Sequence, residues 1–330
     1  MSPAAPSINR QWVLSSRPAG LVKESDFAWR EVPVPAPSEG QFLVRNLYLS
    51  FDPAMRGWME DRPSYVPPVA IGEVMRAGSV AQVVESKNPV FRPGEFVQGT
   101  FGWQDYAVSD GRGPLPVSKL PPGVPLTWPL GVLGITGLTA YFGLLDLGNP
   151  AAGETAVVSG AAGATGSVAA QIAKLKGCRV IGIAGGRDKC AWLRDVAGLD
   201  AAIDYKAEDV GGRLRALCPR RIDLYFDNVG GPILDAVLAQ IAVRARIVLC
   251  GGISSYNASS RAAPARPWTS TPPSRRCSPP SCSCSSDASS SPARSTSCSA
   301  IPICRSRSFQ PIARPRPRST TRNAISTTRS

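Results

Sequence analysis

The sequence predicts an α/β fold in which a β-rich N-terminal region precedes a doubly wound parallel sheet. Three observations carry this prediction. Short apolar runs between Gly and Pro residues fill the first third of the chain, helical and strand patterns alternate in the middle, and a glycine-rich turn joins a strand to a helix near residue 160. From residue 257 onward both patterns stop, so we expect the C-terminal part to be disordered or truncated.

Residues 1–125 read as a small β-rich domain, with strands expected over residues 41–49, 72–75, 81–85 and 96–99. The Gly78-Ser79 turn separates the second and third of these strands, and Pro93-Gly94 introduces the fourth. Many short strands between turn residues are typical of a barrel or a sandwich. We therefore expect a distorted barrel here.

Residues 126–256 alternate between helix and strand, which predicts a parallel sheet with helices on both faces. A long apolar helix is expected over residues 130–147, and further helices over 190–197 and 233–241. Strands are expected over residues 156–159, 179–184, 201–204, 222–226 and 246–249. Ligands of such folds bind at the carboxyl ends of the strands, where Tyr205 and the pair Asp227-Asn228 fall. Ordinary loop roles remain the alternative for these polar residues.

The turn Ser159–Gly166 reads Ser-Gly-Ala-Ala-Gly-Ala-Thr-Gly and leads directly into a helical pattern. Glycines allow backbone N–H groups to close on phosphate, and the helix N-terminus adds partial positive charge. Glycine turns also close ordinary strand–helix connections, which is the alternative interpretation. Because both the strand and the helix are present, the motif predicts a dinucleotide site.

The end of the next strand indicates which dinucleotide. An NAD-preferring site usually carries an acidic residue there to hold the ribose 2′-hydroxyl. This chain instead has Gly185 and Gly186, followed by Arg187 and Lys189. Asp188 could hold a hydroxyl, but its position is more typical of the start of a helix, and the two cations could also be only a solvated helix face. The pattern favours NADP over NAD.

The composition excludes several kinds of chemistry. The 330 residues are 43% hydrophobic, which suffices for two domains, and they include no histidine. A Ser-His-Asp triad, a histidine base and a histidine-ligated metal are thereby excluded. The cysteines before residue 257 are widely spaced and read as free thiols of a cytoplasmic protein, with no metal site. Neither a signal peptide nor a membrane-spanning run is apparent.

The basic net charge of the chain is concentrated at its C-terminal end. Residues 257–330 contain twelve arginines, no lysine and Asp287 as the single acid, so +11 of the formal charge of +13 falls there. The body is nearly neutral. Runs such as Arg314-Pro-Arg-Pro-Arg318 leave open a rival interpretation, a weak binder of nucleic acid or other anionic polymers. The segment has few aromatic residues for base stacking, so we expect no specific nucleic-acid partner.

Six blocks occur in order along the chain. They are residues 46–56 (NLYLSFDPAMR), 133–141 (LGITGLTAY), 159–166 (SGAAGATG), 171–178 (QIAKLKGC), 226–231 (FDNVGG) and 250–257 (CGGISSYN). Together they are more specific than any one glycine motif. Through these blocks the body of the chain, residues ~10–257, resembles the zinc-independent medium-chain dehydrogenases/reductases, and most closely the branch of prostaglandin reductases, leukotriene B4 dehydrogenases and 2-alkenal double-bond reductases.

This resemblance implies a GroES-like substrate domain in residues 1–125 and a Rossmann NADP-binding domain in residues 126–256. It implies a phosphate loop at Gly163, Ala164, Thr165 and Gly166, and 2′-phosphate contacts at Lys189 and Tyr205. Further coenzyme contacts are implied at Asn228 and at Cys250, Gly251, Gly252, Ile253, Ser254, Ser255 and Tyr256. Tyr256 would lie beside the nicotinamide and the substrate carbonyl as the catalytic residue. Ala54 stands where many relatives have a tyrosine, which should alter substrate choice.

The activity implied by the resemblance is NADPH-dependent reduction of the C=C bond of α,β-unsaturated aldehydes and ketones. Hydride would reach the β-carbon, while Tyr256 or a ribose hydroxyl stabilises the enolate oxygen without a metal. For Tyr256, packing without a proton role is the alternative. An NADPH-dependent quinone reductase is the alternative activity. The expected partner is a small-molecule enone or enal, with no membrane association.

The resemblance ends at Asn257, where family members continue with a sixth strand and a return segment. We interpret residues 257–330, a low-complexity Ser/Pro/Arg segment, as the product of a reading-frame shift in a GC-rich gene. Relatives often form homodimers through their sixth strands, so dimerisation is doubtful here. An inactive product with a basic tail is a further alternative, because the fifth strand would be left as an exposed edge.

Overall fold

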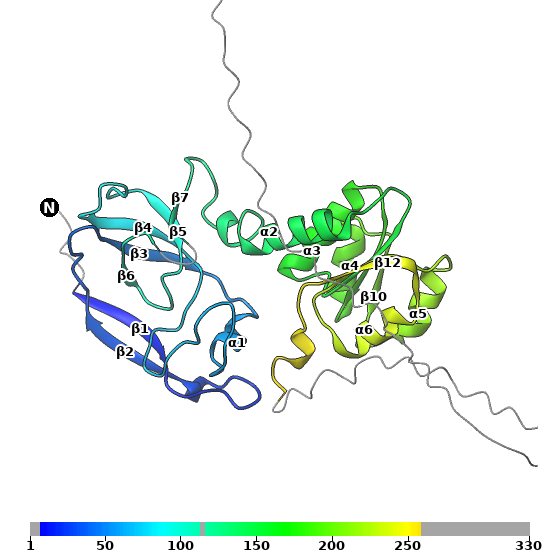
Figure 1. The fold of residues 1–330 in the computed structure, drawn as a ribbon, viewed down its shortest axis with the longest axis horizontal. Coiled ribbons are helices and arrows are strands. Elements are labelled where there is room, and N and C mark those ends of the chain that lie inside the picture. The colour runs from blue at the N-terminus through cyan, green and yellow to red at the C-terminus, as the bar shows by residue number, and fades with distance from the viewer. Residues whose placement is uncertain (1–6, 113–115, 259–330) are drawn as a thin grey trace, which may run out of the picture. The chain divides into compact units, whose positions relative to one another are not determined.

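The computed structural model describes residues 7–112 and 116–258 (Figure 1). We call residues 7–119 the β-rich part and residues 135–258 the sheet part, and each is described by itself. The expected tail is residues 257–330, of which residues 259–330 lie outside the described residues, as do residues 1–6 and 113–115.

The β-rich part contains a two-stranded antiparallel pair and a five-stranded antiparallel sheet. The pair consists of β1 (Ile8–Leu14) and β2 (Phe27–Pro33). The sheet has the order β6-β3-β4-β5-β7. Its strands are β3 (Phe42–Leu49), β4 (Ser79–Ser86), β5 (Phe96–Gly99), β6 (Tyr106–Ser109) and β7 (Ser118–Lys119). A 3₁₀ turn (Glu24–Asp26) precedes β2, and the short helix α1 (Met55–Trp58) follows β3.

The short strands predicted for this part are largely confirmed, with two corrections. Residues 72–75 form no strand, because Gly72 adopts a left-handed turn (φ 85°) and only Val74 bridges to Val13 of β1. The second correction is the antiparallel pair of β1 and β2, which the sequence analysis did not predict. One apolar core lies inside the sheet, around Phe42, Val83 and Phe101, and a second lies under α1.

The sheet part is built on five parallel strands in the order β10-β9-β8-β11-β12. They are β8 (Thr155–Ser159), β9 (Arg179–Ala184), β10 (Ala201–Asp204), β11 (Ile222–Asp227) and β12 (Ile241–Leu249). Strand order reverses between β8 and β11, so the loops after these two strands diverge and leave a crevice for ligands there. The predicted doubly wound sheet is confirmed.

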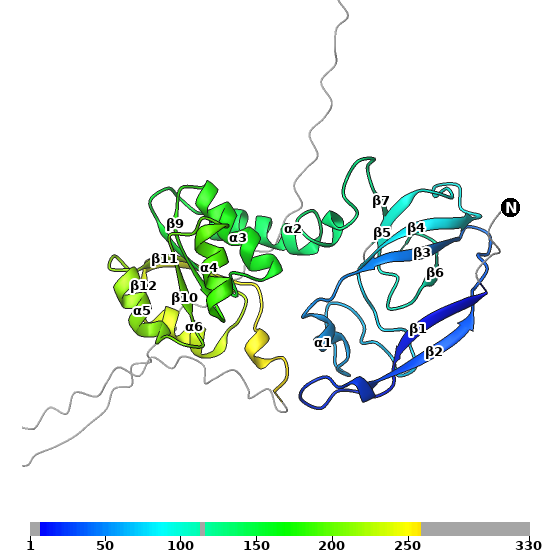
Figure 2. The ribbon, with the colours of Figure 1, turned by 180° about the vertical axis from the view of Figure 1, so that it is seen from behind.

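Helices cover both faces of this sheet (Figure 2). They are α2 (Ile135–Phe142), α3 (Ala164–Leu175), α4 (Arg187–Asp195), α5 (Val210–Leu217) and α6 (Gly231–Leu238). Alternate residues of each strand point to opposite faces. Val158 and Phe226 pack with α2, α3 and α4, while Val157 and Tyr225 pack with α5 and α6.

Several helix boundaries differ from the prediction. The apolar stretch over residues 130–147 divides into a 3₁₀ turn (Trp128–Leu130), α2 and a π-helical turn (Gly143–Gly148). Helix α6 ends at Leu238 instead of residue 241, because Ile241 already pairs with Ile222 as the first residue of β12. Strand β12 is therefore longer than the predicted 246–249, and it contains a bulge where Arg244 has φ 66°.

Strand β12 forms an edge of the sheet as far as the structure describes the chain. Four of its nine residues are exposed, Val243 to 93%, and only Val248 is buried. A strand with one free row of backbone N–H and C=O groups is a site for pairing with another segment. The expected sixth strand would pair here, but it falls outside the described residues. Among the helices that are described, none is sufficiently long and apolar to cross a membrane.

Candidate dinucleotide site

The glycine turn after β8 leads into helix α3 in a conformation that only glycine allows at two positions. Gly160 adopts a left-handed conformation (φ 57°). A Cβ at Gly166 would lie 2.2 Å from the carbonyl oxygen of Gly160, so the helix packs directly on the turn. The N-cap residue Gly163 offers no side-chain cap, so the first amides of α3 have no side-chain acceptor. Gly163 and Ala164 are exposed, and Thr165 is half-buried.

These features test whether the turn fits the diphosphate of a dinucleotide. The first N–H groups of a helix lack intrahelical acceptors and attract anions, an effect that the helix dipole strengthens. The exposed Gly163 and Ala164 leave the backbone of this turn open to a ligand. The residues of the turn therefore fit a diphosphate, and the glycines allow the diphosphate to approach the backbone closely.

A second set of predicted residues gathers where β9 and β10 end. A Cβ at Gly185 would lie 2.8 Å from the ring of Tyr205 and 3.0 Å from Cε of Lys206, so both side chains lie over this glycine. Tyr205 is 46% exposed. Lys189 lies exposed in the first turn of α4, whose N-cap is Gly186 and not Asp188. The cation Lys206, which the sequence analysis did not single out, therefore joins Tyr205 at this glycine.

Asp204 holds the backbone of this region in place. Its carboxylate accepts hydrogen bonds from the amides of Gly186 (2.8 Å) and Lys206 (3.0 Å), and these bonds lower the pKa of Asp204 below its usual range. Backbone amides thus hold the negative charge of Asp204 at the end of β10. The end of β9 is followed by two glycines, Gly185 and Gly186, and not by an acidic residue. This arrangement leaves room for a phosphate and supplies cations around it.

The third set is organised by Asp227 at the end of β11, which is 1% exposed. One carboxylate oxygen of Asp227 accepts from the hydroxyls of Ser159 and Tyr225 (both 2.7 Å) and from the amides of Val229 and Gly230 (both 3.0 Å). Burial raises the pKa of Tyr225, so its hydroxyl stays protonated as a donor. Asp227 is consequently a buried acceptor that joins the ends of β8 and β11 to the loop after β11.

Asn228 and the segment after β12 are tied to this centre. Asn228 donates from its side chain to the carbonyl of Ser159 (2.7 Å), which brings it beside the glycine turn. The amides of Cys250 and Gly251 donate to the carbonyl of Asp227 (2.8 and 3.0 Å). The structure thereby joins Asn228, the glycine turn and the start of the 250–256 segment around one buried residue.

The remainder of this segment forms a 3₁₀ turn (Ile253–Ser255) that is anchored to the loop after β11. Ser254 donates from both its hydroxyl (2.6 Å) and its amide (3.1 Å) to the carbonyl of Val229, and the Ser255 hydroxyl donates to Gly252. Tyr256 is half-buried, and its hydroxyl accepts from the amide of Gly252 at 3.3 Å. Its oxygen therefore lies over the glycine pair that follows β12.

Ala54 lies outside these three sets, immediately before helix α1, and is half-buried. For metals, no group of three or more His, Cys, Asp or Glu side chains gathers anywhere in residues 7–112 or 116–258. The donors that a zinc site would need are therefore not assembled among these residues.

Comparison with known proteins finds two family models that match the chain. Residues 10–117 match the family model described as the N-terminal domain of oxidoreductase. Residues 164–270 match the model described as zinc-binding dehydrogenase.

Three similar proteins have names that state their activity. The chain is 50% identical to the NADPH-dependent curcumin reductase of Escherichia coli, over 76% of the chain and 72% of that protein. It is 42% identical to mouse prostaglandin reductase 1 (75% and 74%) and 40% identical to the NADP-dependent 2-alkenal reductase of Nicotiana tabacum (76% and 74%).

A solved structure shows the same fold with a coenzyme bound. CurA from Vibrio vulnificus, in complex with NADPH, is 50% identical and has a TM-score of 0.72, over 78% of this chain and 75% of that one. Close relatives are thus NADPH-dependent oxidoreductases, one of them a reductase of 2-alkenals. The chain belongs to the zinc-independent medium-chain dehydrogenases/reductases, in the branch of the curcumin, prostaglandin and 2-alkenal reductases.

Proposed function

We propose that this protein reduces the C=C bond of α,β-unsaturated aldehydes and ketones with NADPH. The observation that carries the proposal is the gathering of the glycine turn, Asn228 and the 250–256 segment around Asp227, in a chain whose relatives use NADPH. As part of the proposal, residues 126–256 hold the coenzyme and residues 1–125 hold the substrate.

The coenzyme contacts follow from the three sets of residues. The amides of Ala164, Thr165 and Gly166 bind the diphosphate, because they lie at the start of α3 where no side chain caps them. Gly163, whose own amide donates to the carbonyl of Gly160, lets the diphosphate approach the backbone. Lys189 and Tyr205 bind the 2′-phosphate, and Lys206 adds a second cation beside Tyr205. Asn228 and residues 250–256 line the ribose and nicotinamide.

When bound, NADPH supplies the hydride for the β-carbon of the substrate, and water supplies the proton that the α-carbon takes up. The protein's task is to align the substrate and to stabilise the charge that develops on the carbonyl oxygen. The Tyr256 hydroxyl is the donor in this proposal, and it already lies over the backbone of Gly252. Because the charge is met by a hydrogen bond, this chemistry needs no carboxylate or histidine at the reacting atoms.

The test uses NADPH carrying deuterium at the transferable position and three substrates: 2-nonenal, nonanal and a simple benzoquinone. We expect NADPH consumption with 2-nonenal and product labelled at the β-carbon. Label at the aldehyde carbon would instead show carbonyl reduction, and consumption with the quinone alone would replace the proposal by quinone reduction. A parallel titration with Lys189→Ala should weaken NADPH binding and leave NADH binding unchanged.

A further inference from the structure

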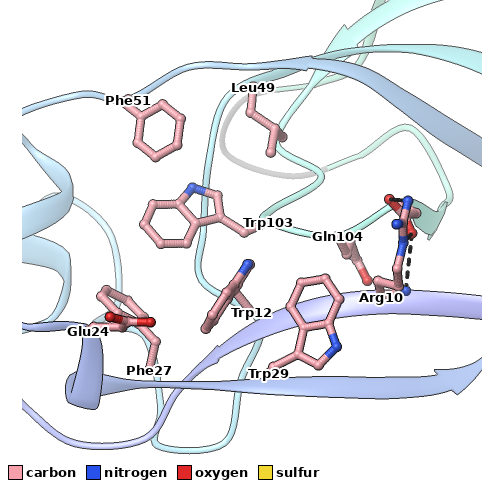
Figure 3. Close-up of a pocket in the computed structure, with 10 residues that line it drawn as sticks. Arg10, Trp12, Glu24, Phe27, Trp29, Leu49, Phe51, Trp103 and Gln104 are labelled. Carbon is pink, nitrogen blue, oxygen red and sulfur yellow. Dashed lines mark hydrogen bonds and ion pairs between the residues drawn. The ribbon is translucent and has the colours of Figure 1, made fainter.

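A pocket of about 600 Å³ is lined entirely by residues of the β-rich part (Figure 3). Its walls come from β1, β2 and the 3₁₀ turn before it, the end of β3 and the segments after β3 and β5. Five of the lining residues are aromatic: Trp12, Phe27, Trp29, Phe51 and Trp103. The volume falls in the range of sites for small molecules. None of the residues assigned to the coenzyme lines this pocket.

The floor of the pocket is held rigidly by backbone hydrogen bonds. The amide of Trp12 donates to the carbonyl of Trp103 (2.9 Å), and the amide of Trp103 donates to the carbonyl of Met75 (2.8 Å). The Trp12 and Trp29 rings meet edge to face at 5.1 Å, as a cross-strand pair of β1 and β2. Aromatic walls favour a flat aromatic ligand, which can stack on them.

The charged groups at the rim do not favour an anion. Arg10 is paired with Asp105, with its Nε 2.6 Å from the carboxylate, so its charge is already neutralised (Figure 3). Glu24 contributes a further carboxylate to the lining. The Gln104 side chain is held by three hydrogen bonds, because its oxygen accepts from Asn9 and Gln11 and its nitrogen donates to Phe101. Among the lining residues, no unpaired cation is therefore left for an anionic ligand.

One polar group on the walls is unsatisfied. The indole nitrogen of Trp103 is one of four buried side-chain polar atoms, among the residues that the structure describes, with no hydrogen-bond partner. Figure 3 shows this nitrogen on the side of the ring that faces Phe51 and Leu49. A buried donor without an acceptor costs about 1–3 kcal/mol. Phe51, which is 75% exposed, is the wall that can turn to admit an acceptor.

We propose that this pocket binds a neutral, planar aromatic molecule whose carbonyl or ether oxygen accepts a hydrogen bond from the Trp103 indole. Binding stacks the aromatic rings of the ligand between the tryptophan and phenylalanine walls and satisfies the buried donor. The lining residues of this site are all different from those assigned to NADPH.

Calorimetric titration of the full chain without NADPH tests the proposal, using 2-acetylnaphthalene and 2-ethylnaphthalene as probes. The two probes are similar in shape, and only the first has an acceptor; neither contains an enone. We expect the acetyl compound to bind 2- to 10-fold more tightly, in line with a neutral hydrogen bond worth about 0.5–1.5 kcal/mol. Trp103→Phe should abolish that preference and leave binding of the ethyl compound unchanged.

Trp29→Ala removes an exposed wall and should weaken binding of both probes, whereas Trp192→Phe on helix α4 should change neither. If the wild-type protein binds neither probe saturably, or binds both equally, the proposal is wrong. It is also wrong if Trp103→Phe keeps the preference for the acetyl compound. Because no step involves NADPH, these outcomes are separate from those of the reductase test.

Discussion

The Ser159 hydroxyl, at the end of β8, donates to the buried carboxylate of Asp227, at the end of β11, over 2.7 Å. The same hydroxyl accepts from the amide of Asn228 at 2.9 Å. This link crosses the point where strand order reverses, and it fixes the glycine turn relative to the loop after β11. Four of the five predictions below concern this crevice or the glycines around it.

Asp227→Asn should lower both the free energy of unfolding and the affinity for NADPH. The substitution keeps one acceptor oxygen but removes the charge that strengthens four hydrogen bonds, for an expected loss of about 1–3 kcal/mol. Denaturant unfolding and NADPH titration measure the two effects. Asp223→Asn is the matched control: this residue lies near the opposite end of β11, where its carboxylate accepts from the amide of Thr155. An equal loss of NADPH affinity in the control would contradict the assignment.

Gly166→Ala should destabilise the protein, although alanine is normally the better helix former by about 1 kcal/mol. The new Cβ would lie 2.2 Å from the Gly160 carbonyl, and because that atom is backbone, the clash should outweigh the helix propensity by about 1–3 kcal/mol. The control is Gly57→Ala in α1, where a Cβ would meet nothing within 4 Å and stability should not fall. Thermal unfolding of both variants measures the change in stability. A Gly166→Ala protein as stable as the wild type would contradict the prediction and show that the turn can move to accommodate the new Cβ.

Gly185→Asp should shift the coenzyme preference toward NADH. The carboxylate would stand at the end of β9, where an NAD-preferring site holds the ribose hydroxyl, and would repel a 2′-phosphate. We expect a change in the NADPH-to-NADH affinity ratio of at least about tenfold, on the scale of a charged hydrogen bond. Gly185→Ala is the control, since it also displaces Tyr205 but adds no charge. A similar change in both variants would assign the effect to Tyr205 alone.

Tyr256→Phe should lower kcat for 2-nonenal by about 100-fold or more if its hydroxyl stabilises the enolate, the scale seen for one oxyanion donor. KM for NADPH should change little, because the ring is kept. Single-turnover kinetics separate the chemical step from product release. An unchanged chemical rate would leave Tyr256 as a packing residue and assign the donor role to the ribose hydroxyl.

Glu154→Gln should reduce stability in a pH-dependent manner. The Arg246 guanidinium, which donates to both oxygens of Glu154, holds the pKa of this carboxyl below its ordinary value of about 4.5. A group whose pKa is lower in the folded state stabilises the protein above its unfolded pKa, and that stabilisation disappears as the pH falls through the folded value.

The pair is partly exposed, so we expect about 0.5–1 kcal/mol between wild type and Glu154→Gln near neutral pH. The difference should vanish as the pH falls below 4.5. Denaturant unfolding across this range measures it, with Asp235→Asn, an exposed residue of α6, as control. A difference that persists unchanged at acidic pH would show that packing of Glu154, and not its charge, is responsible.

The spacing of apolar residues and the positions of turn residues were enough to predict the parallel sheet, because its buried strands are continuous apolar runs between helical segments. The same signals failed for α5, where Gly211 and Gly212 weaken the helical pattern although Asp209 caps both of their amides. They failed again at residues 241–245, because an edge strand with a bulge has no buried face to impose a period of two.

At the candidate site, the glycines and Lys189 were predictable because their backbone role or charge is local in sequence. The hub around Asp227 was not, since Ser159 and Asp227 lie far apart in the chain and meet only when β8 and β11 pair. Lys206 was missed for a related reason. It adjoins Tyr205 in sequence, but only the packing of both side chains over Gly185 shows that it belongs to the same site.

The distribution of cysteines gives the sheet part a chemical reporter of its own. Cys178, Cys190 and Cys218 are buried there, while the β-rich part contains no cysteine. Burial raises the pKa of all three thiols, that of Cys218 to about 11, so at neutral pH they stay protonated and slow to alkylate. Site-resolved iodoacetamide labelling of these three positions would therefore time the opening of the parallel sheet, without interference from motions of the β-rich part.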